Sequence, residues 1–202
     1  MLDMALKKTE KLEAYKKYGT RIGTSMTNKS IERFVFKRIA NKFTILNIKL
    51  IDERIKLAAQ MLNAYKRKDI LLVCTLDSAY YGVYNFAKLM NVSVNFGRYL
   101  AGSLTNTSYK NFFEPKILLI TDPSANQRAI NDARRINIPI IGVCNTDNKT
   151  SFIDLIIPGN NKSGNSIGLM LYLLAWEMGK KEEREKLDKV TIEDFMTKEL
   201  AF

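Results

Sequence analysis

The sequence predicts an α/β protein, a doubly wound three-layer sandwich built on a mainly parallel sheet. Two observations lead to this fold class. Five short runs rich in Ile, Leu and Val recur between residues 69 and 158, and several lack polar alternation, as strands buried on both faces do. Helix-length segments separate most of these runs, and strands that alternate with helices pair in parallel through right-handed crossovers.

The part of the chain before the sandwich contains a predicted helix, loop and hairpin. Residues 5–18 have the composition of a short basic helix, and the Gly, Thr, Ser and Asn residues of 19–30 predict an irregular loop. Apolar residues then alternate in two short runs separated by RIAN at 38–41, which indicates a β-hairpin. The apolar face of this hairpin would consist of Phe34, Phe36, Phe43, Ile45 and Ile48. Its other face would carry Arg33, Lys37 and Lys42.

The remaining elements follow in the order of a Rossmann-like or flavodoxin-like sandwich. A surface helix is predicted over 50–65, where apolar residues recur at three- and four-residue spacing. The expected strands cover 69–74, 92–96, 116–121, 139–144 and 152–158. The expected helices between and after them cover 78–90, 125–136 and 163–177. In the tail, Thr191 with Asp194 three residues later resembles a capping box and predicts a short helix.

The net charge of +11 is unevenly distributed along the 202 residues. Residues 1–68 hold 17 Lys or Arg against 6 Asp or Glu, whereas residues 69–202 hold 15 of each. A basic first third on a neutral body favours a polyanionic partner, because neutralised phosphates release counterions. Nucleic acid is the leading candidate, and an anionic membrane surface is the weaker one.

Within this basic first third, about thirty residues are rich in Lys and Arg interleaved with aromatic residues, a combination suited to structured RNA. The basic side chains predicted to contact RNA phosphates are Lys16, Lys17, Arg21, Lys29, Arg33, Lys37, Arg38 and Lys42. The interleaved aromatics are Tyr15, Tyr18, Phe34 and Phe36. We interpret the two Phe residues as hairpin core and not as stacking platforms.

Several classes of chemistry are excluded by composition. The chain has no His, so hydrolase triads and imidazole acid-base catalysis are absent, and two Cys without His make a zinc site improbable. Cys74 and Cys144 each end an apolar run and are expected to be buried free thiols in a reducing compartment. The longest apolar run, IGLMLYLLAW, is about half of the roughly 20 residues that a spanning helix needs. We therefore expect a cytoplasmic protein without cofactor, metal or membrane partner.

An enzyme remains the alternative. Asp77, Asp122 and Asp147 follow strand ends and could hold Mg²⁺ for phosphoryl transfer in a Rossmann-like site, although the sequence places no Lys or His convincingly near them. Asp122 could equally cap the helix that follows it. The segment PGNNKSGNS at 158–166 imitates a phosphate loop but has Asn165 at the Lys position, which favours a simple turn into a helix.

Several ordered motifs resemble one known family. They are YGTRIGT at 18–24, LIDERIKLAA at 50–59, GRYLAGSLTN at 97–106, EPKILLITDPSANQRA at 114–129, NIPIIGVCNTD at 137–147, IDLIIPGNNK at 153–162 and SIGLMLYLLAWE at 166–177. Together they are similar to the small ribosomal subunit protein S2 family, in the archaeal and eukaryotic cytosolic branch that includes the laminin-receptor precursor. Departures from the family pattern stand at Arg21, Ala101, Ser124, Asn126 and Trp176.

The resemblance implies a non-catalytic component of the small ribosomal subunit that binds ribosomal RNA and neighbouring ribosomal proteins, without a small-molecule substrate. It also adds Thr24, in the loop that the family turns toward RNA, to the expected contact residues. We expect three regions. Residues 1–48 form the RNA-facing helix, loop and hairpin, residues 49–180 the sandwich, and residues 181–202 a tail with a short helix.

Overall fold

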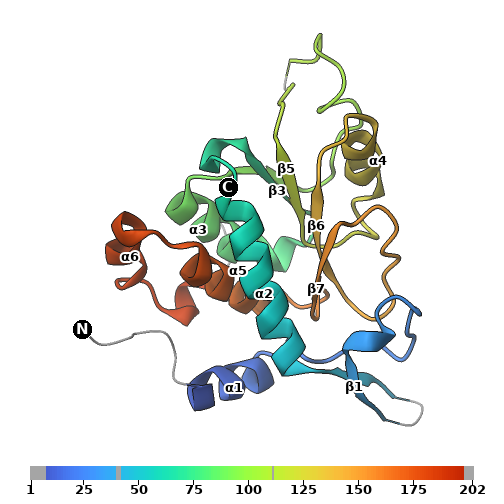
Figure 1. The fold of residues 1–202 in the computed structure, drawn as a ribbon, viewed down its shortest axis with the longest axis vertical. Helices are drawn as coiled ribbons and strands as arrows, with labels where there is room; N and C mark the ends of the chain where they lie inside the picture. Colours follow the sequence, from blue (N-terminus) through green and yellow to red (C-terminus); the bar gives the residue numbers. More distant parts are fainter. Residues whose placement is uncertain (1–7, 40–41, 111, 198–202) are drawn as a thin grey trace.

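A five-stranded parallel sheet forms the centre of the molecule (Figure 1). The computed structural model describes residues 8–39, 42–110 and 112–197. The strands are β3 (Ile70–Cys74), β4 (Ser93–Phe96), β5 (Ile117–Ile120), β6 (Ile140–Cys144) and β7 (Leu155–Pro158). Their spatial order is β4-β3-β5-β6-β7, so the chain runs outward from β3 in one direction and then returns across it. This order is that of a doubly wound fold, and the predicted fold class is confirmed.

Two layers of helix and loop cover the sheet. Helices α2 (Ile48–Asn63), α3 (Tyr80–Met90) and α5 (Gly164–Met178) pack on one face, and α4 (Gln127–Arg135) packs on the other with the described residues of the chain around Tyr99, Leu104 and Phe113. Alternate residues of each strand supply the two cores. In β3, for example, Ile70, Leu72 and Cys74 point to the first core, and Leu71 and Val73 to the second.

The apolar run IGLMLYLLAW lies in α5, which is buried over most of its length between the sheet and its neighbouring helices. Its hydrophobicity therefore serves the core. None of the helices in the described ranges is long and apolar enough to cross a bilayer. Cys74 and Cys144 are buried free thiols, as predicted, and burial raises the pKa of both.

The N-terminal elements are α1 (Lys8–Lys17), the 3₁₀ turn η1 (Glu32–Phe34) and the strands β1 (Val35–Arg38) and β2 (Thr44–Leu46). The predicted helix and hairpin are thus present, except that residues 5–7 and 40–41 lie outside the described residues. Strands β1 and β2 are antiparallel, and Ile22 forms a bridge with Ile45 on the other edge of β2.

One prediction about the hairpin is wrong, because β1 contains a bulge. The register joins Val35 to Leu46 and then Lys37 to Ile45, which leaves Phe36 without a partner across the ladder. A bulge interrupts strict side-chain alternation. Phe34 is buried at 2% exposure, as expected of hairpin core, but Phe36 is 71% exposed. The assignment of Phe36 to the core is therefore corrected.

The C-terminal part contains α6 (Lys181–Leu187) and η4 (Ile192–Phe195), and short 3₁₀ turns, η2 (Arg67–Asp69) and η3 (Asp77–Ala79), flank β3. The predicted capping box at Thr191 is present, but it opens a 3₁₀ turn instead of an α-helix. Phe195 is buried in the core on the α5 side. A Cβ at Gly168 would come within 2.1 Å of the carbonyl oxygen of Phe195.

Candidate nucleic-acid interface

The loop that follows α1 lies across the carboxyl ends of β6 and β7. After β7, the backbone N–H of Asn160 donates to the carbonyl of Thr20 at 2.9 Å, and its side-chain Nδ2 donates to Gly19 O at 3.3 Å. After β6, the carbonyl of Thr146 accepts a hydrogen bond of 2.7 Å from Asn28 N–H. Both strand ends therefore hold the loop in place.

The loop also packs closely against the sandwich at Gly23 and Thr24. Thr24 N–H donates to Thr146 Oγ1 at 2.8 Å, and the two threonine hydroxyl oxygens lie 2.9 Å apart. A Cβ on Gly23 would lie 2.3 Å from Thr44 Oγ1 and 2.6 Å from Thr146 Cγ2. Only glycine fits between β2 and the strand-end loop.

Asp122 follows β5, next to the point where the strand order reverses, and its carboxylate is already engaged. It accepts hydrogen bonds from Ser124 N–H at 2.9 Å, from Asn148 Nδ2 at 3.3 Å and from Lys162 Nζ at 2.9 Å. Sequence reasoning placed no Lys near this carboxylate, and the structure corrects that with Lys162. The acidic group thus joins three strand-end loops and serves the fold.

The other two strand-end aspartates do not join Asp122. Asp77 and Asp147 are both exposed to solvent. Within the described residues, no group of three or more His, Cys, Asp or Glu side chains is placed to hold a metal ion. The arrangement that a metal-dependent phosphoryl-transfer enzyme would need is not formed by these carboxylates.

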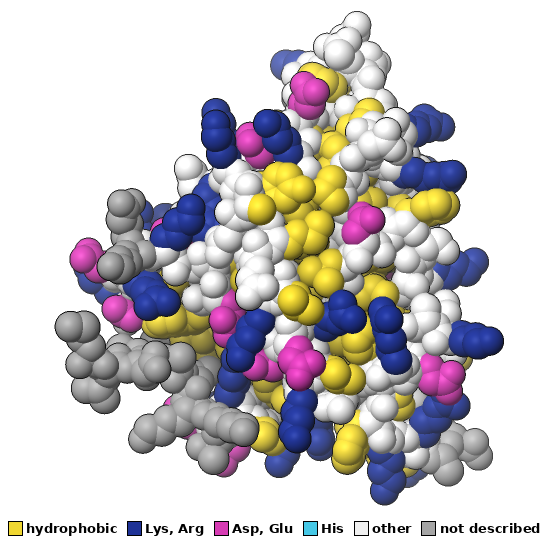
Figure 2. Space-filling model, in the orientation of Figure 1, with side chains coloured by type: hydrophobic (Ala, Val, Ile, Leu, Met, Phe, Trp, Pro, Cys, Tyr) yellow, Lys and Arg dark blue, Asp and Glu magenta, His cyan; other side chains and the backbone are white. Residues whose placement is uncertain are grey.

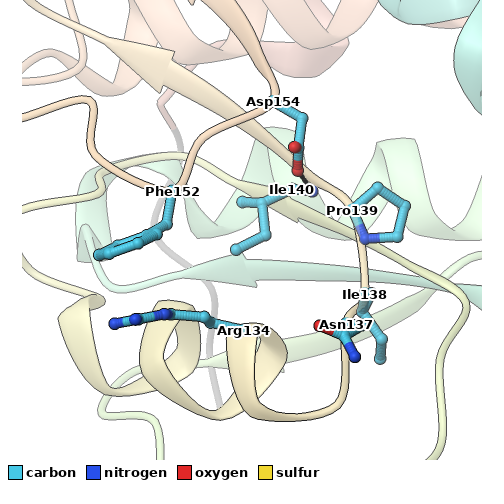
Figure 3. A pocket seen from close by; sticks show the side chains of 7 residues that line it. All are labelled: Arg134, Asn137, Ile138, Pro139, Ile140, Phe152 and Asp154. Atoms are coloured by element: carbon cyan, nitrogen blue, oxygen red, sulfur yellow. Dashed lines mark hydrogen bonds between the residues drawn. The ribbon is translucent and has the colours of Figure 1, made fainter.

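A hollow of about 300 Å³ lies at the amino ends of β6 and β7, between α4 and the residues before β7 (Figure 3). The Arg134 guanidinium stacks 4.0 Å from the centroid of the Phe152 ring. The Asp154 carboxylate accepts a hydrogen bond of 2.7 Å from Ile140 N–H. Both charged groups already have partners inside the protein. We therefore interpret the hollow as part of the packing between α4 and β7 and not as a ligand site.

Helix α1 is fixed to the sandwich by a polar cluster around Asp52 of α2. Lys11 Nζ lies 2.5 Å from Asp52 Oδ1, and Lys56 Nζ lies 3.2 Å from Oδ2. Burial opposes ionisation of Asp52, but the hydrogen bonds and charges of the two lysines outweigh it and hold the pKa of the carboxyl below its usual value. Tyr15 is 1% exposed and donates its hydroxyl proton to Asp52 at 3.5 Å. Burial beside this carboxylate raises the pKa of the Tyr15 hydroxyl.

We call residues 16–42 of this assembly the cationic segment. Seven of its predicted contact side chains are exposed to solvent: Lys16, Lys17, Lys29, Arg33, Lys37, Arg38 and Lys42. Figure 2 shows Lys and Arg side chains gathered over the lower right of the molecule, where β1 and the preceding loop lie, with further ones along the other margins. Seven exposed cations on one docked segment form a surface suited to a polyanion.

Arg21, Thr24 and Arg38, among the predicted contact residues, also make hydrogen bonds or ion pairs that bear on their role. Arg21 is half-buried, and its carbonyl accepts a hydrogen bond from Leu46 N–H at 2.8 Å. The hydroxyl of Thr24 donates to Met26 O at 2.9 Å, so Thr24 shapes the loop. Arg38 forms an exposed ion pair of 2.7 Å with Glu32.

Of the four interleaved aromatics, three are used by the protein itself. Tyr15 is buried, Tyr18 has the Lys17 ammonium 5.3 Å from its ring centroid, and Phe34 has the guanidinium of Arg33 at 4.8 Å. Phe36 is the exposed aromatic that sequence reasoning missed. No local signal identifies it, because its exposure results from the bulge between the two strands.

Comparison with known proteins gives matches over most of the chain. The family model for ribosomal protein S2 matches residues 109–179. The small ribosomal subunit protein uS2 of Ignicoccus hospitalis is 39% identical over 164 residues, which cover 81% of this chain and 77% of that protein. The protein of the same name from Methanococcus maripaludis is 38% identical, covering 82% and 76%. That of Picrophilus torridus is 37% identical over 186 residues, covering 91% and 93%.

The fold and its surface define an α/β sandwich that carries a docked, cationic N-terminal segment. The strand-end carboxylate of Asp122 is tied into the protein, and the exposed part of the cationic segment faces outward. The chain belongs to the small ribosomal subunit protein uS2 family. The predicted family and the predicted absence of enzymatic function are thereby confirmed.

Proposed function

We propose that this protein is a structural constituent of the small ribosomal subunit, where it binds ribosomal RNA and neighbouring ribosomal proteins in support of translation. Membership of the uS2 family supports the structural role. The cytoplasm, as the site of the ribosome, belongs to the same proposal. So do the three regions 1–48, 49–180 and 181–202, of which the first faces RNA.

The observation that carries the RNA-binding role is the docked cationic segment with its seven exposed Lys and Arg side chains. Lys and Arg neutralise phosphates and release their counterions, which provides affinity with little base specificity. Docking against the strand ends supports the role further, because a held segment loses less conformational entropy on binding than a free arm does. The proposed RNA-binding surface also includes Arg21 and Thr24. The role of Thr24 in it is to shape the loop.

Charge reversal tests the proposal. Changing Arg33, Lys37 and Arg38 together to Glu should block incorporation into small subunits, measured by sedimentation of the tagged protein on a gradient. The three side chains are exposed, so circular dichroism should match the unchanged protein. Thermal unfolding should shift only by the small contributions of the exposed Arg38–Glu32 ion pair and the Arg33–Phe34 contact.

A matched control keeps the number of reversed charges but moves them to the sandwich. Lys88, Lys110 and Arg128 are exposed and lie outside the cationic segment. Their combined change to Glu should leave incorporation largely intact. Normal incorporation of the first variant, or equal loss with the control, would contradict the assignment of RNA binding to the cationic segment.

A further inference from the structure

The aromatic ring of Phe36 is the most exposed one in the cationic segment. It is 71% exposed, whereas Phe34, two residues earlier, is buried. Over the described residues, the structure gives the ring of Phe36 no stacking partner and no cation–π partner. A single exposed apolar side chain is common on proteins, so the setting of this one decides its meaning.

The way in which β1 pairs with β2 accounts for the exposure of Phe36. The bulge removes it from the ladder between Val35 and Lys37, and β1 lies at the outer edge of the small sheet. Bulges re-aim side chains at sheet edges. The inner edge is occupied, because Ile22 pairs with Ile45 on the far side of β2. Phe36 therefore lies on the edge strand of a short, docked sheet, with its ring exposed to solvent.

The two residues that follow Phe36 in β1 are cationic. Lys37 and Arg38 follow it directly and are exposed, and Arg33 is exposed three residues before it. The cores of protein–protein interfaces are depleted in Lys, whereas grooves for unpaired nucleic acid combine cations along the backbone with aromatics on which bases stack. This composition favours a nucleobase over an apolar protein surface as the occupant.

We propose that Phe36 stacks on an unpaired base of the RNA whose phosphates the neighbouring Arg33, Lys37 and Arg38 hold. This inference rests on the proposed function and assigns it a base-contacting residue. Structured RNA offers such bases in loops and bulges, where they are unstacked and accessible. The contact tolerates any base, because every base has a π-face.

Affinity measurements on the full chain with purified small-subunit ribosomal RNA test the stacking. Phe36→Ala should weaken binding by about 5- to 150-fold, the range that corresponds to loss of one stacked base. Phe36→Leu, which keeps apolar bulk but no ring, should lose a similar factor, and Phe36→Trp should bind at least as tightly as Phe. The slope of log affinity against log salt should stay unchanged, because no charge is lost.

Phe152→Ala provides the control, since Phe152 is also exposed, at 49%, but its ring stacks on Arg134. This variant should bind RNA as the unchanged protein does. Undiminished binding by Phe36→Ala or by Phe36→Leu would overturn the inference. Melting curves should show no loss of stability for the Phe36 variants, given the exposure of that side chain.

Photocrosslinking identifies the partner directly. With p-azidophenylalanine at position 36, irradiation of assembled small subunits should join the protein to RNA, and a crosslink to a protein neighbour would overturn the inference. The two proposals fail in different ways. If the unchanged protein does not bind ribosomal RNA, both are wrong; if it binds and charge reversal abolishes binding while Phe36→Ala does not, only the stacking is wrong.

Discussion

The hydroxyl oxygens of Thr24 and Thr146 lie 2.9 Å apart, although 122 residues separate them along the chain. The same Thr146 oxygen accepts the backbone N–H of Thr24 at 2.8 Å. This pair joins the loop before the hairpin to the end of β6. The position of the cationic segment on the sandwich therefore depends on a side chain that itself carries no charge.

Thr146→Val should loosen the loop while preserving side-chain shape. Because the Thr24 N–H loses its acceptor and the Thr24 hydroxyl keeps only its bond to Met26 O, the free energy of unfolding should fall by about 1–2 kcal/mol. Hydrogen exchange at Thr24 and Asn28 should quicken by a larger factor than at the core strands. Thr107→Val, at an exposed position, should change neither quantity. Unaltered exchange at Thr24 would contradict this role for Thr146.

Gly23→Ala should displace the loop from β2. The added Cβ would meet Thr44 Oγ1 at 2.3 Å and Thr146 Cγ2 at 2.6 Å, so the backbone has to shift. We expect a loss of about 1–3 kcal/mol in urea unfolding, as for other overpacked sites, together with weaker RNA binding. Ser25→Ala, at an exposed position two residues later, should behave as the unchanged protein. Equal stability of the two variants would show that the contact at Gly23 is not tight.

The contribution of Asp52 to the stability of the protein, through its contacts with α1, should depend on pH. Its pKa is lowered in the folded state by Lys11 and Lys56, so the unfolded chain binds the proton more readily. The stability from this group is therefore complete above the ordinary pKa of an aspartate and is lost as the pH falls through the lower, folded value. Unfolding midpoints in urea between pH 7 and pH 3 measure this loss.

Asp52→Asn should remove that part of the pH dependence, and the difference between the two proteins should shrink as the pH falls. Asp147→Asn, which alters an exposed carboxylate, serves as the control and should keep the full acid sensitivity. A constant difference between the unchanged protein and Asp52→Asn across this pH range would argue against the ion-pair cluster.

Much of the sandwich was predictable because its signals are local. Doubly buried strands such as β3 and β6 consist of uninterrupted apolar residues, and their order with the helices determines the layers. The observed ends of some elements differ from the predicted ones where the backbone conformation does not allow a strand. The last strand was expected from residue 152 but begins at Leu155, since Phe152 adopts a left-handed φ of 65° that no strand accommodates.

The parts that the sequence did not reveal depend on contacts between distant residues. The bulge at Phe36 reflects how β1 pairs with β2, and period-two reasoning assigned that ring to the core. The ion pair of Lys162 with Asp122 joins loops 40 residues apart. The basic contact residues were predicted from charge, and Thr24 from the family resemblance; whether each of them touches RNA stays a prediction.

The salt dependence of binding to small-subunit ribosomal RNA tests the central claim most directly. If all seven exposed cations of the cationic segment contact phosphates, log affinity should fall against log salt with a slope of about −5 to −6. Neutralising Arg33, Lys37 and Arg38 together to Gln should make that slope shallower by about 2–3. An unchanged slope in this variant, or binding of the unchanged protein that is insensitive to salt, would contradict phosphate neutralisation by this surface.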